Sequence, residues 1–215
     1  MKSITSQKPF EEITGYLERF DRVFIVGCGT CTTMMKTGGV DEVAEMSAQL
    51  QDAGKLVTGT VVLPTACDEM TAEVMNEHSQ EIEMADCLVI MSCALGVQKV
   101  AQYIDNKPVL PGVDTLFIGV EDIPGVFKEA CDQCGQCILG ETAGICPITA
   151  CHKGLVNGPC GGTKDGMCEV DKEKPCAWTL IYRRLERLGQ LDLMKKYHGP
   201  KNYQVAPRPR IVKVP

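Results

Sequence analysis

Short apolar runs alternate with amphipathic stretches through the first half of the chain. The runs are rich in β-branched residues, as buried parallel strands are, and the clearest lie at Arg22–Gly27, Leu56–Leu63 and Leu88–Ser92. Apolar positions at helical spacing lie between and after them, over Val40–Ala53, Glu69–Met84 and Gly96–Asp105. Two further short runs, Val109–Leu110 and Leu116–Val120, complete the series.

This alternation predicts the fold of the first half. Strands separated by helical segments of about 10–15 residues indicate βαβ units and a parallel sheet. We therefore predict an α/β fold for residues 1–123, a small doubly wound parallel sheet of the flavodoxin or Rossmann type. In such a sheet the carboxyl ends of the strands converge on one crevice, which is the usual ligand site.

The pattern changes near Ile123. Residues 131–176 hold eight of the 13 cysteines among many glycines and contain no long periodic segment. Such a stretch cannot bury enough apolar surface to fold unaided, so we predict an irregular domain over residues 124–198 that is stapled by metal. It ends in an amphipathic helix over Trp178–Tyr197, interrupted near Gly189. Residues 199–215 are rich in proline and basic side chains and predict an extended tail that binds a partner.

Composition narrows the class of protein. The N-terminus has no apolar core typical of a signal peptide, which indicates a cytoplasmic protein, where disulfides are rare. An odd total of 13 cysteines also excludes complete pairing, so metal coordination is the favoured use. The longest apolar stretch, Cys87–Val97, is shorter than the roughly 20 residues of a membrane span. The net charge of −6 argues against nucleic-acid binding.

Four cysteines of the first half follow predicted strands. They are Cys28, Cys31, Cys67 and Cys93. Four thiolates at one sheet edge suit an iron–sulfur cluster or a zinc ion. A nucleotide site is disfavoured because the Gly27–Gly29 turn lacks the third glycine of the dinucleotide fingerprint. A redox dithiol of Cys28 and Cys31 stays open, although it leaves the other two unexplained. Cys87 opens a strand at the opposite edge and is interpreted as a buried hydrophobe.

The second half carries a CxxCxxC triplet followed later by Cys-Pro. This order resembles that of bacterial ferredoxins, although the gap before Cys146-Pro147 is longer here. Eight thiols suffice for two four-cysteine sites, which can be two [4Fe–4S] clusters or one cluster and one zinc, and the spacing does not assign the ligands to sites. The eight are Cys131, Cys134, Cys137, Cys146, Cys151, Cys160, Cys168 and Cys176. His152 is interpreted as a solvated neighbour, and no general acid, base or nucleophile apart from thiolates is evident.

These residues resemble a known family. The run CDQCGQCILGETAGICPITACHKGLVNGPCGGTKDGMCEV, followed by CAW and IYRRLERL, is similar to the cysteine-rich C-terminal domain associated with methylenetetrahydrofolate reductases. With the preceding α/β domain and its CGxC turn, the chain resembles the iron–sulfur and zinc subunits of the acetogen-type reductase. These subunits partner the flavin-bearing MetF.

The resemblance implies a non-catalytic electron-transfer subunit in one-carbon metabolism, within the Wood–Ljungdahl pathway. It would hold up to three [4Fe–4S] clusters, or zinc in place of one, with all twelve cysteines named above as ligands. Electrons would pass from a ferredoxin, a NADH-oxidising subunit or a heterodisulfide-reductase-like module to the flavin of MetF, which reduces 5,10-methylenetetrahydrofolate to 5-methyltetrahydrofolate. A structural zinc scaffold that only holds the flavin subunit is the alternative.

Overall fold

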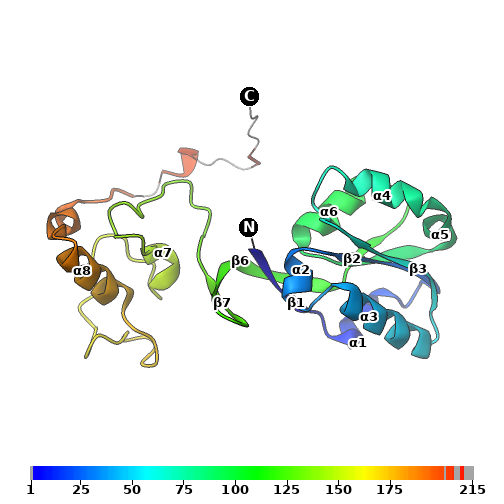
Figure 1. The fold of residues 1–215 in the computed structure, drawn as a ribbon, viewed down its shortest axis with the longest axis horizontal. Helices are drawn as coiled ribbons and strands as arrows, with labels where there is room; N and C mark the ends of the chain where they lie inside the picture. Colours follow the sequence, from blue (N-terminus) through cyan, green and yellow to red (C-terminus); the bar gives the residue numbers. More distant parts are fainter. Residues whose placement is uncertain (1, 201, 206–208, 211–215) are drawn as a thin grey trace. The chain divides into compact units, whose positions relative to one another are not determined.

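A computed structural model describes residues 2–200, 202–205 and 209–210 of the chain. The chain divides into two compact units, Met1–Gly119 and Val120–Pro215. Figure 1 labels most helices and strands of both units. No helix in these described ranges is long and apolar enough to cross a membrane.

The first unit is built on a four-stranded parallel sheet, as predicted. Its strands are β2 (Arg22–Cys28), β3 (Leu56–Leu63), β4 (Cys87–Met91) and β5 (Val109–Pro111). They lie in the order β3-β2-β4-β5, and every neighbouring pair is parallel. The connection after β2 leads to β3 at one edge of the sheet, whereas the connection after β4 leads to β5 at the other edge. The chain therefore leaves β2 and β4 in opposite directions. The crevice at the carboxyl ends of these two strands is therefore the topological switch point of the sheet.

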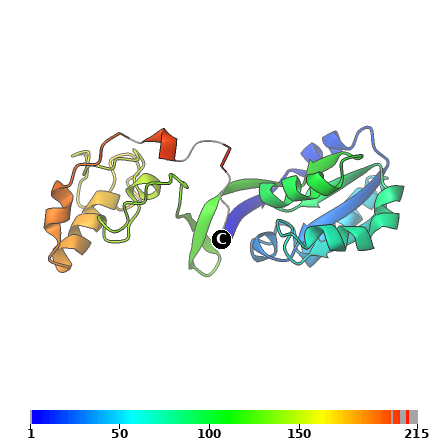
Figure 2. The ribbon, with the colours of Figure 1, turned by 90° about the horizontal axis from the view of Figure 1, so that it is seen from above.

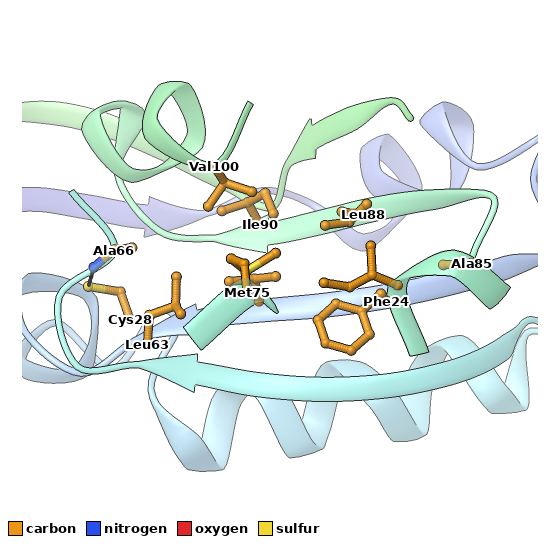
Figure 3. Close-up of a cluster of buried hydrophobic side chains, with 11 residues drawn as sticks. Phe24, Cys28, Leu63, Ala66, Met75, Ala85, Leu88, Ile90 and Val100 are labelled. Atoms are coloured by element: carbon orange, nitrogen blue, oxygen red, sulfur yellow. Dashed lines mark hydrogen bonds between the residues drawn. The ribbon is translucent and has the colours of Figure 1, made fainter. Parts of the chain in front are cut away.

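Helices cover both faces of this sheet (Figures 1 and 2). One face packs against α1 (Phe10–Tyr16) and α3 (Val40–Asp52), and the other against α4 (Thr71–Glu77), α5 (Ser79–Met84) and α6 (Ala94–Tyr103). Because successive side chains of a strand point to opposite faces, Val23 and Ile25 join the first core and Phe24 and Val26 the second. Figure 3 shows the second core, whose labelled side chains include Phe24, Leu88 and Val100.

Two expectations for this unit are wrong. The run Leu116–Val120 does not belong to the parallel sheet; it lies in β6 (Val113–Ile123), which pairs antiparallel with β1 (Lys2–Gln7) in a second sheet of order β1-β6-β7. Only Gly112 separates β5 from β6, and a parallel return needs a crossover of about a dozen residues or more. The helix expected over Glu69–Met84 is two helices that meet at His78.

The second unit has few regular elements. They are β7 (Val126–Glu129), α7 (Pro147–Ala150), α8 (Ala177–Arg187) and the 3₁₀ turns Leu191–Lys195 and Tyr203–Val205. Its core consists of Trp178, Ile181 and Leu185 on α8, with partly buried apolar side chains packed around them. The helix predicted over Trp178–Tyr197 ends at Arg187, and Gly189, with a φ of +65°, turns the chain where an interruption was predicted. Much of the predicted tail, residues 201, 206–208 and 211–215, lies outside the described residues.

Candidate metal centres

One cavity of the first unit is lined by all four cysteines that follow its strands. Cys28, Cys31, Cys67 and Cys93 share a cavity of about 200 Å³. Hydroxyl side chains complete most of the lining, and they are Ser3, Thr30, Thr32, Thr65 and Ser92. The cavity lies where the loops after β2, β3 and β4 meet, so segments far apart in the chain build it together.

The ends of β2 and β4 fix two of these cysteines. Cys28 is the last residue of β2, and its backbone N–H donates to Gly38 O at 2.9 Å. Cys93 is the N-cap of α6, and both side chains are buried. A Cβ on Gly38 would lie 1.8 Å from Met91 O, so only glycine lets the turn after β2 approach β4 this closely. A Cβ on Gly27 would lie 2.6 Å from Gly38 O, and one on Gly29 would lie 3.0 Å from Pro64 O, so close packing also accounts for the two glycines of the Gly27–Gly29 turn.

Hydrogen bonds to sulfur favour a thiolate at Cys28. Burial opposes its ionisation, but the Ala66 N–H donates to Sγ at 3.4 Å and Thr30 Oγ1 lies 3.2 Å away, so the pKa of Cys28 is held below its usual value. Burial, with a contribution from the nearby Cys93 and Cys28, raises the pKa of Cys67. Several thiolates at one site repel one another. A bound cation would relieve this repulsion, and soft thiolates select zinc, copper(I) and iron–sulfur clusters.

Cys87 is separate from this site, as predicted. It is fully buried among the side chains that face α1 and α3. Burial raises the pKa of its thiol to about 12, so it stays protonated and inert at neutral pH.

In the second unit, four of the eight cysteines line one small recess. Cys151, Cys160, Cys168 and Cys176 surround a volume of about 20 Å³, together with Thr163 and Trp178. Cys176 is the N-cap of α8. Burial disfavours its thiolate, but hydrogen bonds from Thr179 and from the Trp178 N–H outweigh it and lower the pKa of Cys176. Sequence spacing alone did not identify this grouping.

The CxxCxxC triplet lies on a tightly turned loop. Gln133 and Gly135, which separate its cysteines, have positive φ values of 54° and 78°. The Gln133 N–H donates to Cys131 Sγ at 3.3 Å, and the Gly162 N–H donates similarly to Cys160 Sγ at 3.4 Å. Backbone N–H groups that donate to a ligating sulfur stabilise its negative charge and so tune metal thiolate sites. Cys146, the N-cap of α7, is the remaining member of the eight.

The thiols carry no disulfide, and their chemistry fits thiophilic metals. All 13 cysteines lie in the described ranges, and none of them is bonded to another cysteine there. Within those ranges no group of three or more Cys, His, Asp or Glu side chains is close enough to hold a metal ion as it stands. Metal binding at the four-cysteine cavity of the first unit, or at the four-cysteine recess of the second, therefore requires the cysteine side chains to turn inwards. His152 is exposed, in keeping with its interpretation as a solvated residue, and its Nε2 lies 3.8 Å from an Asp171 carboxylate oxygen.

Comparison with known proteins supports the reductase relationship for the second half. Residues 110–204 match the family described as methylene-tetrahydrofolate reductase C terminal, so this part of the chain is related to that family. The match includes the eight cysteines and α8. A search of curated proteins gives no significant match.

Two solved structures share a limited likeness of fold. An ABC transporter substrate-binding protein from Sphaerobacter thermophilus is 15% identical with a TM-score of 0.36, over 49% of this chain and 28% of that one. A putative branched-chain amino acid ABC transporter from Rhodospirillum rubrum is 13% identical with a TM-score of 0.31, over 44% of this chain and 24% of that one. The chain thus spans about a quarter of the length of each.

Proposed function

We propose that this chain is MetV, the electron-transfer subunit of an acetogen-type methylenetetrahydrofolate reductase. Its partner is a MetF-type flavin subunit that reduces 5,10-methylenetetrahydrofolate to 5-methyltetrahydrofolate in the Wood–Ljungdahl pathway. The observation that carries the proposal is the convergence of four cysteines on one cavity at the switch point of the parallel sheet. The family match over residues 110–204 supplies the link to the reductase.

The residues of this chain have defined roles in the proposal. Cys28, Cys31, Cys67 and Cys93 hold one [4Fe–4S] cluster, and the cysteines of residues 131–176 hold the remaining metal centres. A bound cluster supplies one-electron transfer, which a flavin on the partner converts into a two-electron hydride. The Ala66 N–H and the Thr30 hydroxyl, both near Cys28 Sγ, stabilise negative charge on that sulfur.

The proposal leaves folate reduction entirely to MetF. The twelve cysteines act as metal ligands, and no side chain of this chain serves as an acid, a base or a nucleophile towards the folate. The upstream donor is a ferredoxin, a NADH-oxidising subunit or a heterodisulfide-reductase-like module.

The test is the metal content and colour of the chain, co-expressed with MetF and purified without oxygen. Iron, sulfide and zinc are measured with the visible spectrum, and flavin reduction in the complex is followed by stopped flow with a reduced ferredoxin. We expect iron with matching sulfide, a brown protein and reduction of the flavin. A colourless zinc protein would refute the relay and favour the scaffold alternative.

A matched pair of variants tests the ligands of the first unit. Cys67→Ala, at an exposed position of the cavity, should lose one cluster and slow flavin reduction at least tenfold. Cys87→Ala, buried at the other end of β4, should keep the full iron content. Equal iron in both variants would show that Cys67 is not a ligand. If both iron and sulfide are absent from the parent protein, Cys28 and Cys31 become candidates for a redox dithiol.

The tail is proposed to bind the flavin subunit. Deletion of residues 200–215, whose sequence is basic and rich in proline, should reduce co-purification with MetF. Unchanged complex formation by the truncated chain would refute this role.

A further inference from the structure

The chain after the 3₁₀ turn Leu191–Lys195 returns to the loop that carries the CxxCxxC triplet. We call this segment the strap, and its described residues are 196–200, 202–205 and 209–210. Two of its hydrogen bonds reach residues between the cysteines of the triplet. The Asn202 N–H donates to Gln136 Oε1 at 3.1 Å, and Arg210 Nη1 donates to Gln133 O at 3.0 Å. The strap is therefore held against the CxxCxxC loop by the chain's own contacts.

An asparagine side chain fixes the start of the strap. The His198 N–H donates to Asn157 Oδ1 at 2.7 Å, and Asn157 Nδ2 donates to His198 O at 2.8 Å. One amide side chain thus satisfies both backbone groups of His198. Asn157 is exposed, so shortening its side chain removes both bonds without opening a void in the core of the second unit.

A carboxylate on the far side of the triplet adds a charged contact. Glu141, four residues after Cys137, pairs with the Lys196 ammonium, and its Oε2 lies 3.1 Å from His198 Nε2. The Lys196 side chain is 56% exposed, and ion pairs open to solvent contribute little to stability. This contact therefore positions the strap more than it stabilises it.

The strap is held by polar contacts more than by packing. A cavity of about 560 Å³ is lined by strap residues from Tyr197 to Pro200 and by loop residues that include Cys134 and Ile138. Closely packed interiors contain few voids larger than a water molecule. Tyr197 and Tyr203 are 75% and 77% exposed, and tyrosine is enriched where proteins bind each other. The strap thus buries little apolar surface against the loop and offers aromatic side chains to a second protein.

We infer that the strap is an autoinhibitory contact. In the chain without its partner it holds the tail against the CxxCxxC loop, and MetF binds the tail only after the strap is released. The same segment cannot both bond to Gln133 and Gln136 and wrap a second protein, so the two states exclude each other. Release also uncovers the loop for that partner. The inference rests on the proposed function for the identity of the partner.

The sign of one mutational effect tests this inference. Asn157→Ala, in the full chain purified without oxygen, should raise amide hydrogen exchange over residues 196–205 and 131–141. It should also bind purified MetF about threefold to tenfold more tightly, because a net hydrogen bond changes an equilibrium by about this factor and the closed strap lowers the apparent affinity. Gln136→Ala, which removes only the acceptor for Asn202, should act in the same direction and serves if Asn157→Ala does not fold. Asn106→Ala, at an exposed position of the first unit, should change neither quantity.

The outcomes separate the strap from its regulatory role and from the proposed function. Raised exchange with equal or weaker binding of MetF would overturn autoinhibition, because a merely structural contact would weaken the complex when lost. Unchanged exchange in both variants would show that these contacts do not hold the strap. If the parent and the variants all fail to bind MetF, the proposed partner and the autoinhibitory role are both refuted, whereas raised exchange in the variants would still establish the strap.

Discussion

Replacing Gly96 by alanine tests how tightly the four-cysteine cavity of the first unit is supported. Gly96 lies in the first turn of α6, three residues after Cys93. A Cβ at this position would lie 2.3 Å from Ser92 Oγ and 2.7 Å from the Ala66 Cβ. Ser92 and Ala66 are almost fully buried, so neither has space to retreat. Both hydrogen-bond to Cys28, which connects the substitution to the candidate ligands.

Two opposing effects set the magnitude. Alanine is favoured over glycine inside a helix by about 1 kcal/mol. Overpacking of a filled core costs about 1–3 kcal/mol, and contacts this short belong at the upper end of that range. The difference predicts that Gly96→Ala lowers the free energy of unfolding of the first unit by about 1–2 kcal/mol.

Gly15→Ala is the matched control. Gly15 lies in α1, and nothing stands within 4 Å of the position that a Cβ would take, so the same substitution there should stabilise the unit by about 0.5–1 kcal/mol. Urea unfolding should be followed by far-UV circular dichroism for the first unit and by fluorescence for the second, because Trp178 is the sole tryptophan of the sequence. If Gly96→Ala has the same free energy of unfolding as Gly15→Ala, the conclusion that Ser92 and Ala66 leave no space for a Cβ at position 96 is refuted.

Two further substitutions test the electrostatics of the sheet and the core of the second unit. The Asp86 carboxylate accepts hydrogen bonds from the Arg22 guanidinium and backbone N–H, which lower its pKa to about 2. Because the folded pKa lies below the unfolded one, this contribution is complete above about pH 4 and is lost as the pH falls towards 2. With solvent screening taken into account, Asp86→Asn should lower the free energy of unfolding by about 1 kcal/mol at pH 7 and by less in acid. Urea unfolding at several pH values measures this difference, and a loss of stability that does not change with pH would contradict the role of the Asp86 pKa. Trp178→Phe removes the bond to Leu155 O and should cost about 1 kcal/mol in calorimetric unfolding of the second unit, whereas an unchanged transition would show that this bond contributes nothing.

The sequence predicts the parallel sheet well because burial on both faces leaves a clear signal. Runs such as Arg22–Gly27 are apolar at nearly every position, and a parallel strand covered by helices requires this. The run at Leu116–Val120 is equally apolar, but an apolar composition does not encode the direction of a strand. The one-residue link between β5 and β6 is too short for a parallel crossover, and it therefore keeps this run out of the parallel sheet. Strand β1, Lys2–Gln7, has a polar sequence and no such run, so only its pairing with β6 reveals it.

The candidate sites were predictable to different degrees. In the first unit, strand ends converge by topology, so the position of each cysteine after a strand was sufficient to place it. In the second unit no sheet orders the loops, and the grouping of Cys151 with Cys176 depends on turns that spacing does not specify. The hydrogen bond from the Ala66 N–H to Cys28 Sγ was also missed, because a backbone donor leaves no signature in side-chain identity.

The two recesses differ in how far along the chain their cysteines are spread. Cys28 to Cys93 come from three strand ends, so their cavity exists only after long-range strand pairing is complete. Cys151 to Cys176 lie within one short stretch and need mainly local turns. Local contacts form faster than distant ones, and a metal can drive the folding of the loops that bind it. Under the proposed function, metal loading in the cell should then run against the order of synthesis. The later stretch would capture its metal as a nascent loop, whereas the earlier set of cysteines would bind metal only in a finished domain.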